Sequence, residues 1–138
     1  MAERPDAEVL EELLGLERRL ISIYEAGLRR EAIDPELAET LLAQEREHAS
    51  ALERALASGT RNPRASVPPP ALGAALRSRE GFARIALGME AEMLAAYIDA
   101  AASIRDQRLR QPLGSIMACE AAHSVALRDS LGARSLVD

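Results

Sequence analysis

Residues that build disulfide-bonded or β-rich folds are scarce in this sequence. Aromatic residues make up 2% of the 138 residues, tryptophan is absent, and cysteine occurs once, at Cys119. A single cysteine excludes an internal disulfide bond and a metal site built from paired cysteines. Alanine, leucine, glutamate and arginine are abundant instead, and all four are strong helix formers. The composition therefore predicts an all-α fold.

Positive charge and long apolar runs are scarce as well. Lysine is absent, all 17 basic residues are arginine, and the formal net charge is −5. An acidic chain without a dense basic cluster is not expected to bind nucleic acid. No apolar run approaches the ~20 residues that cross a bilayer, and the first residues do not resemble a signal peptide. We therefore expect a cytoplasmic protein that binds neither nucleic acid nor membrane.

The length and the apolar periodicity predict one helical domain that spans residues 1–138. Apolar residues recur every three or four positions in four stretches, at about 6–30, 35–58, 78–104 and 112–131. Asp34 and Pro35 suit the start of the second helix, and Gly132 suits the end of the fourth. Residues 59–77 include three successive prolines, which cannot continue a helix. The expected architecture is a four-helix bundle with one long crossover, between its second and third helices.

The two histidines of the chain stand in the same local pattern. Glu45 precedes His48 by three residues, and Glu120 precedes His123 by three residues. Side chains three positions apart on a helix project from one face about one turn apart, so each pair can reach the same point in space. Because this pattern uses every histidine, it indicates a common site more strongly than either pair would alone.

Two further glutamates and the two tyrosines extend the repetition. Glu17 is followed after seven residues by Tyr24, and in the second half of the chain the same spacing separates Glu90 from Tyr97. The offset from Glu17 to Glu90 is nearly the same as the offset between the two Glu-x-x-His pairs. Both halves therefore have the order Glu, Tyr, Glu-x-x-His, which is expected of a duplicated helical hairpin with a pseudo-twofold axis through its core.

The four glutamates of this pattern fall on the apolar stripes that should face the core. If ionised, they would place four negative charges there, and no arginine shares their helix faces. Burial of such charges without compensation is costly. Two divalent cations would neutralise them, and carboxylates with neutral imidazoles suit iron or manganese. An alternative stays open, because protonated carboxyl groups and histidines can form a metal-free hydrogen-bond network.

Four segments of the chain resemble the ferritin-like superfamily, in particular its small bacterial members. The segments are Leu16-Glu17 to Tyr24-Glu25, Glu45-Arg46-Glu47-His48-Ala49, Glu90 to Ala96-Tyr97, and Glu120-Ala121-Ala122-His123. The resemblance extends from about Glu8 to Gly132 and implies a carboxylate-bridged centre of two metal ions, with iron the first candidate and manganese the second. By this resemblance the ligands would be Glu17 and Glu90 at the two ends, Glu45 and Glu120 as bridges, and His48 and His123. Tyr24 and Tyr97 would assist catalysis by orienting these carboxylates.

The resemblance also implies an oxidase or ferroxidase that reacts with dioxygen or peroxide. A non-catalytic helical module that serves a structural or interaction role is the alternative. Leu16 and Ile23 widen the apolar face of the first helix and predict a contact with a second copy of the chain. Glu25, Glu47 and Glu92 lie beside the inward stripes, and we expect them to be solvated.

Overall fold

The computed structural model describes residues 4–56 and 72–132. These residues form four long helices and two short ones, and neither range contains a β-strand. In chain order the elements are α1 (Asp6–Arg29), α2 (Pro35–Leu56), α3 (Leu72–Ala75), α4 (Arg79–Ser103), the 3₁₀ helix η1 (Gln107–Leu109) and α5 (Arg110–Ser130). The all-α fold and the four expected helices are confirmed, and the helices end within a few residues of their predicted limits.

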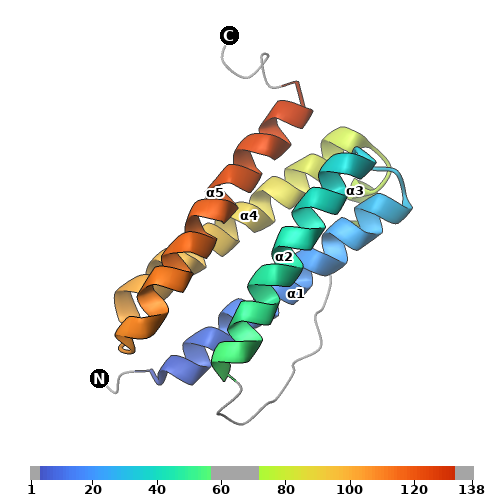
Figure 1. The fold of residues 1–138 in the computed structure, drawn as a ribbon. Helices are drawn as coiled ribbons and strands as arrows, with labels where there is room; N and C mark the ends of the chain where they lie inside the picture. Colours follow the sequence, from blue (N-terminus) through green and yellow to red (C-terminus); the bar gives the residue numbers. More distant parts are fainter. Residues whose placement is uncertain (1–3, 57–71, 133–138) are drawn as a thin grey trace.

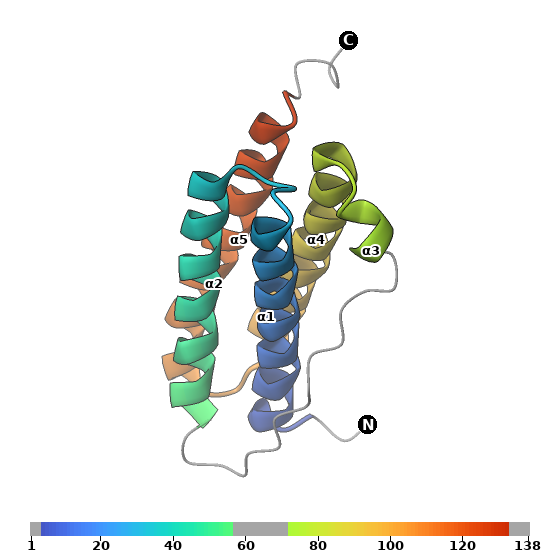
Figure 2. The ribbon, with the colours of Figure 1, turned by 90° about the vertical axis from the view of Figure 1, so that its right-hand side faces the viewer.

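The four long helices form two antiparallel hairpins that pack side by side (Figure 1). α1 pairs with α2, and α4 pairs with α5, while contacts between α1 and α4 and between α2 and α5 join the hairpins. α2 and α4 run in the same direction (Figure 2), so α4 begins at the opposite end of the bundle from the end of α2. Most of the predicted crossover, at residues 59–71, lies outside the described residues. Its last part contains α3, which packs against α4.

Short polar contacts fix where the helices begin. The Asp34 carboxylate accepts the backbone N–H of Leu37 at 3.1 Å, and the Ser78 hydroxyl accepts that of Gly81 at 3.0 Å. Side chains in this position satisfy backbone donors that have no partner within the helix. Asp6, in the first turn of α1, accepts the backbone N–H of Asp106 at 2.9 Å and thereby joins α1 to the connection between α4 and α5.

The core is apolar at both ends of the bundle and polar in its middle. Leucine, isoleucine, alanine and methionine make up most of the buried residues, but four glutamates and both histidines are buried among them. Ile23 is fully buried within the chain, so its predicted contact with a second copy is wrong; Leu16 packs partly buried against the same core. None of the described helices is long and apolar enough to cross a membrane.

Candidate metal centre

All six candidate ligands meet in the middle of the bundle, and each long helix contributes. α1 and α4 each supply one glutamate, and α2 and α5 each supply a Glu-x-x-His pair. The members of this carboxylate–histidine cluster are Glu17, Glu45, His48, Glu90, Glu120 and His123, and all are buried. The four carboxylates have no exposed surface, whereas His48 is 8% exposed and His123 is 2% exposed. The sequence therefore identified the residues that converge, because helical spacing placed them on inward faces.

The cluster divides into two overlapping groups, each able to hold a metal ion. Within a group, one ligand atom per residue lies within 4.8 Å of every other ligand atom. The His48 half-site consists of Glu17, Glu45, His48 and Glu120, and the His123 half-site consists of Glu45, Glu90, Glu120 and His123. Each half-site thus has its own histidine and its own glutamate, and the two half-sites share two carboxylates.

The shared carboxylates direct one oxygen to each histidine. Glu120 Oε1 lies 2.9 Å from His48 Nδ1, and Glu120 Oε2 lies 3.3 Å from His123 Nδ1. Glu45 is arranged in the same way, with Oε1 2.8 Å from His123 Nδ1 and Oε2 3.3 Å from His48 Nδ1. Both glutamates therefore span the two half-sites, as expected of carboxylates that bridge two ions.

The remaining two carboxylates each belong to one half-site. Glu17 Oε1 lies 3.7 Å from His48 Nδ1, and Glu90 Oε1 lies 3.4 Å from His123 Nδ1. A tyrosine from the opposite helix holds each of them. Tyr97 on α4 donates a hydrogen bond to Glu17, and Tyr24 on α1 donates one to Glu90.

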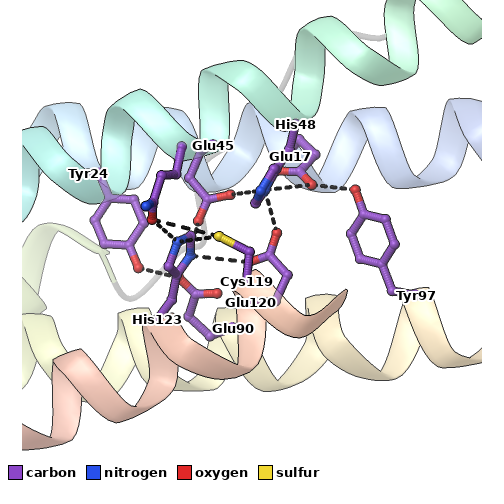
Figure 3. Close-up of polar contacts among 10 residues, drawn as sticks. Glu17, Tyr24, Glu45, His48, Glu90, Tyr97, Cys119, Glu120 and His123 are labelled. Carbon is purple, nitrogen blue, oxygen red and sulfur yellow. Dashed lines mark hydrogen bonds and ion pairs between the residues drawn. The ribbon is translucent and has the colours of Figure 1, made fainter. Parts of the chain in front are cut away.

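These two hydrogen bonds cross between α1 and α4, and Figure 3 shows the tyrosines at opposite ends of the cluster. Tyr24 is further supported by Phe82, whose ring lies edge-on to it with centroids 6.4 Å apart. The predicted placement of both tyrosines beside the carboxylates agrees with this geometry, while their part in catalysis stays a prediction.

Buried polar atoms without a hydrogen-bond partner are concentrated in the cluster. Within the described residues they are Glu17 Oε2, Glu45 Oε1, Glu90 Oε2, Glu120 Oε1, Glu120 Oε2 and His123 Nδ1. His123 Nδ1 is only 2.8 Å from Glu45 Oε1, yet the pair lacks hydrogen-bond geometry. The ring nitrogen is therefore close to three carboxylates without a hydrogen bond to any of them. Such orphaned atoms are rare in folded proteins, and convergent ones are suited to a shared cation.

Protonation balances the charge of the cluster in the metal-free protein. Burial disfavours the charged form of His48, but the nearby carboxylates of Glu120 and Glu45 outweigh it and raise its pKa to about 11. The pKa of His123 is raised further, because the effect of burial is outweighed by three carboxylates close to its ring. Both imidazoles are therefore protonated at neutral pH and offset part of the negative charge of the cluster.

The two unshared carboxyl groups behave differently from Glu120. Burial, together with the charges of neighbouring carboxylates, raises the pKa of Glu17 to about 10. Burial raises the pKa of Glu90 to about 8, a smaller change because the nearby His123 ring opposes it. For Glu120, the effect of burial is outweighed by the two histidine rings close to its oxygens, and the pKa falls to about 2. Divalent cations would have to displace the protons that the histidines, Glu17 and Glu90 retain.

Two residues next to the cluster were not predicted from the sequence to contribute to it. Gln44 Oε1 lies 2.6 Å from His123 Nε2, and Cys119 Sγ lies 3.3 Å from the same nitrogen. Each of these residues immediately precedes the glutamate of a Glu-x-x-His pair, so they occupy equivalent positions in the two halves of the chain. That equivalence is the signal that could have identified them.

The three glutamates predicted to be solvated lie outside the cluster. Glu47 and Glu92 are exposed. Glu25 is half-buried and forms an ion pair with Arg46 at 3.0 Å. None of the three contributes to either half-site.

Two hairpins that meet at buried carboxylates and histidines define a ferritin-like four-helix protein. A family model described as the ferritin-like domain matches residues 5–133. The chain therefore belongs to this family, and the resemblance found in the sequence is confirmed. Neither the comparison with curated proteins nor that with solved structures found a significant match.

Proposed function

We propose that the cluster is a carboxylate-bridged dinuclear metal centre, with iron as the first candidate and manganese as the second. Glu45 and Glu120 would bind both ions, since each directs one oxygen to each half-site. The His48 half-site would be completed by Glu17 and His48, and the His123 half-site by Glu90 and His123. The observation that carries this proposal is the convergence of buried polar atoms that have no other partner.

The donor set fits two divalent cations in number, charge and size. Four ionised carboxylates balance the charge of two such ions, and neutral imidazoles complete a set that suits iron and manganese. Ligand atoms around one ion at ~2.1 Å lie at most about 4.2 Å apart. The atoms of each half-site lie within 4.8 Å of one another, so only a small contraction would be needed.

The chemistry that bound iron supplies in such a centre is reaction of the reduced metal with dioxygen or peroxide, as in an oxidase or ferroxidase. The protein's part is to hold ligands and to exclude water. Tyr24 and Tyr97 fix the orientation of Glu90 and Glu17 through their hydroxyl groups. Met93, fully buried, and Met89, nearly so, belong to the apolar core.

A metal-free structural or interaction module is the competing function. A stable hydrogen-bond network would have to satisfy the buried polar atoms of the cluster, because each one left unpaired costs about 1–3 kcal/mol. Six such atoms have no partner among the described residues. This count favours the metal centre over the metal-free network.

Anaerobic reconstitution with Fe(II) tests the proposal. The wild-type protein should bind about two ions per chain. The double variant Glu45→Ala/His123→Ala should lose both ions and any iron oxidation, while circular dichroism reports a helical fold. Glu47→Ala/Glu92→Ala, which removes two exposed carboxylates, is the matched control and should bind as the wild type does. Absence of binding by the wild type, or normal iron oxidation by the Glu45→Ala/His123→Ala variant, would contradict the proposal.

The choice of metal needs a separate measurement. Protein expressed with iron and manganese both available should contain one of them in excess when its metal content is analysed. An excess of iron would support the oxidase assignment. An excess of manganese would retain the dinuclear site and change only the metal.

A further inference from the structure

The two half-sites differ in what holds the far side of each histidine ring. Nδ1 of both histidines faces the carboxylates. On the other side of the His123 ring, Nε2 lies 2.6 Å from Gln44 Oε1. For His48, no hydrogen bond to Nε2 is found in residues 4–56 and 72–132. One histidine is therefore held from two sides, and the other from one side only.

The contact with Gln44 determines which nitrogen of His123 can bind a metal. An amide oxygen only accepts hydrogen bonds, so Nε2 has to carry a proton to make this contact. In a neutral ring the lone pair then resides on Nδ1, which is the atom that faces the carboxylates. A hydrogen bond of this kind fixes both the tautomer and the orientation of a ligating imidazole.

Side-chain length explains why only one half has this contact. Gln44 on α2 reaches across to His123 on α5 (Figure 3 shows the α5 side of this contact, His123 beside Cys119). The equivalent position on α5 is occupied by Cys119, which has a much shorter side chain. Its Sγ lies near His123 on its own helix and makes no contact with His48 among the described residues.

We propose that Gln44 is a positioning residue that makes the His123 half-site the tighter of the two metal positions. This inference rests on the proposed dinuclear centre. An imidazole already held in the correct tautomer and orientation loses less freedom when it binds an ion. Removal of such a partner of a ligating histidine lowers metal affinity about 10–100-fold.

Anaerobic titration with Co(II) separates the two positions, because each binding step changes both the heat released and the visible spectrum of the ion. The wild type should bind two ions in distinguishable steps. In Gln44→Ala the tighter step should weaken about 10–100-fold while the weaker step is unchanged. Gln44 is exposed, so its replacement leaves the core intact.

Two further variants separate positioning from a general structural effect. Gln44→Glu keeps the length and the acceptor, and should retain the tighter step. Gln44→Asn keeps the amide but shortens the side chain, and should behave as Gln44→Ala does. Gln111→Ala, at an exposed glutamine of α5, is the matched control and should titrate as the wild type does.

The outcomes distinguish this inference from the function on which it rests. A wild type that binds no Co(II) and no Fe(II) contradicts the dinuclear centre itself. A wild type that binds two ions, with Gln44→Ala titrating identically, overturns the role of Gln44 alone. Equal weakening of both steps in Gln44→Ala also overturns it, because Gln44 forms a hydrogen bond with His123 and none with His48 among the described residues.

Discussion

The α1–α2 hairpin and the α4–α5 hairpin supply the same side chains to the cluster but surround them differently. Each contributes one glutamate and one tyrosine from its first helix, and a Glu-x-x-His pair from its second. Two of the differences in the surroundings affect side chains that hold members of the cluster. Gln44 in the first hairpin corresponds to Cys119 in the second, and Gly27, which allows close approach of the Phe82 ring, corresponds to Ala100.

This difference separates two kinds of constraint on the sequence. Residues that converge on the centre are repeated in both halves, since either half-site lacks a donor without its own histidine and glutamate. Among the residues one contact further away, the two tyrosines are repeated, but Gln44 is not, and its contact with His123 makes the half-sites unequal. The pKa values of the unshared carboxyl groups differ as well, about 8 for Glu90 against about 10 for Glu17, because the nearby His123 ring opposes the effect of burial on Glu90.

Loss of a shared carboxylate should remove the distinction between the half-sites altogether. Glu45→Gln keeps the shape of the side chain but leaves a weaker donor in contact with both histidines. We expect neither ion to bind tightly, so the metal content after anaerobic loading and desalting should fall from about two per chain to near zero. Glu47→Gln, two positions along α2 and exposed, should keep the wild-type content. Retention of two ions by Glu45→Gln would mean that Glu45 is not a bridge.

Loss of an unshared carboxylate should instead break one half-site. Glu17→Gln and Glu90→Gln each remove a donor that contacts a single histidine. Each variant should retain about one tightly bound ion per chain. In a Co(II) titration, Glu90→Gln should lack the tighter step and Glu17→Gln the weaker one. Two tight ions in either variant, or the same step missing from both, would contradict the assignment of the half-sites.

The elements and the centre were predictable because their signals are local. Helical periodicity located the long helices, and capping residues such as Asp34 located where they begin. Both histidines, each three residues after a glutamate, then located the cluster. That the six residues bind metal, and in which roles, is a prediction that the titrations above test.

The contacts between helices were not predictable from the same signals. Ile23 was expected at a subunit contact because α1 has apolar residues on more than one face, and periodicity does not tell which face a neighbouring helix covers. The contact of Gln44 with His123 depends on the separation and rotation of α2 and α5. No spacing within one helix contains that information.

The pH dependence of the metal-free protein should distinguish the two unshared carboxyl groups. The pKa of Glu90 is raised from 4.5 to about 8, and that of Glu17 from 4.5 to about 10. A raised pKa contributes stability that is fully present below pH 4.5 and is lost as the pH rises through the folded-state value. His48 acts in the same direction between pH 6.5 and about 11. Below pH 4.5, Glu120 acts oppositely, because its pKa of about 2 means that stability is lost as the pH falls.

The melting temperature of chelator-treated protein should therefore be highest near pH 4.5 and fall steadily toward pH 10. Glu90→Gln should remove mainly the decrease between pH 4.5 and 8, whereas in Glu17→Gln the curve should be flatter up to pH 10. The melting temperature of metal-loaded protein should exceed that of metal-free protein by more as the pH rises. The reason is that metal binding releases the protons that the histidines, Glu17 and Glu90 hold at lower pH. A metal-free melting temperature that is constant from pH 5 to 9 would contradict the protonation described for this cluster.

The smallest expected effect concerns the support of Tyr24. A Cβ atom added at Gly27 would lie 2.4 Å from Cζ of the Phe82 ring, which is buried and packs against Tyr24. Overpacking in Gly27→Ala should therefore destabilise the fold by about 1–3 kcal/mol. The higher helix propensity of alanine should offset up to about 1 kcal/mol of this loss. Thermal or urea unfolding of the metal-free protein measures this difference.

Gly15 and Gly88 provide the matched comparison, since they occupy equivalent positions in the two hairpins, two residues before Glu17 and Glu90. Neither has an atom within 4 Å of an added Cβ, so Gly15→Ala and Gly88→Ala should each stabilise the fold by about 0.5–1 kcal/mol. If Gly27→Ala destabilises the fold while Gly15→Ala and Gly88→Ala stabilise it, the destabilisation comes from the contact with Phe82. If Gly27→Ala were stabilising as well, the Phe82 ring could move aside freely. Its contact with Tyr24 would then contribute nothing measurable to the stability of the fold.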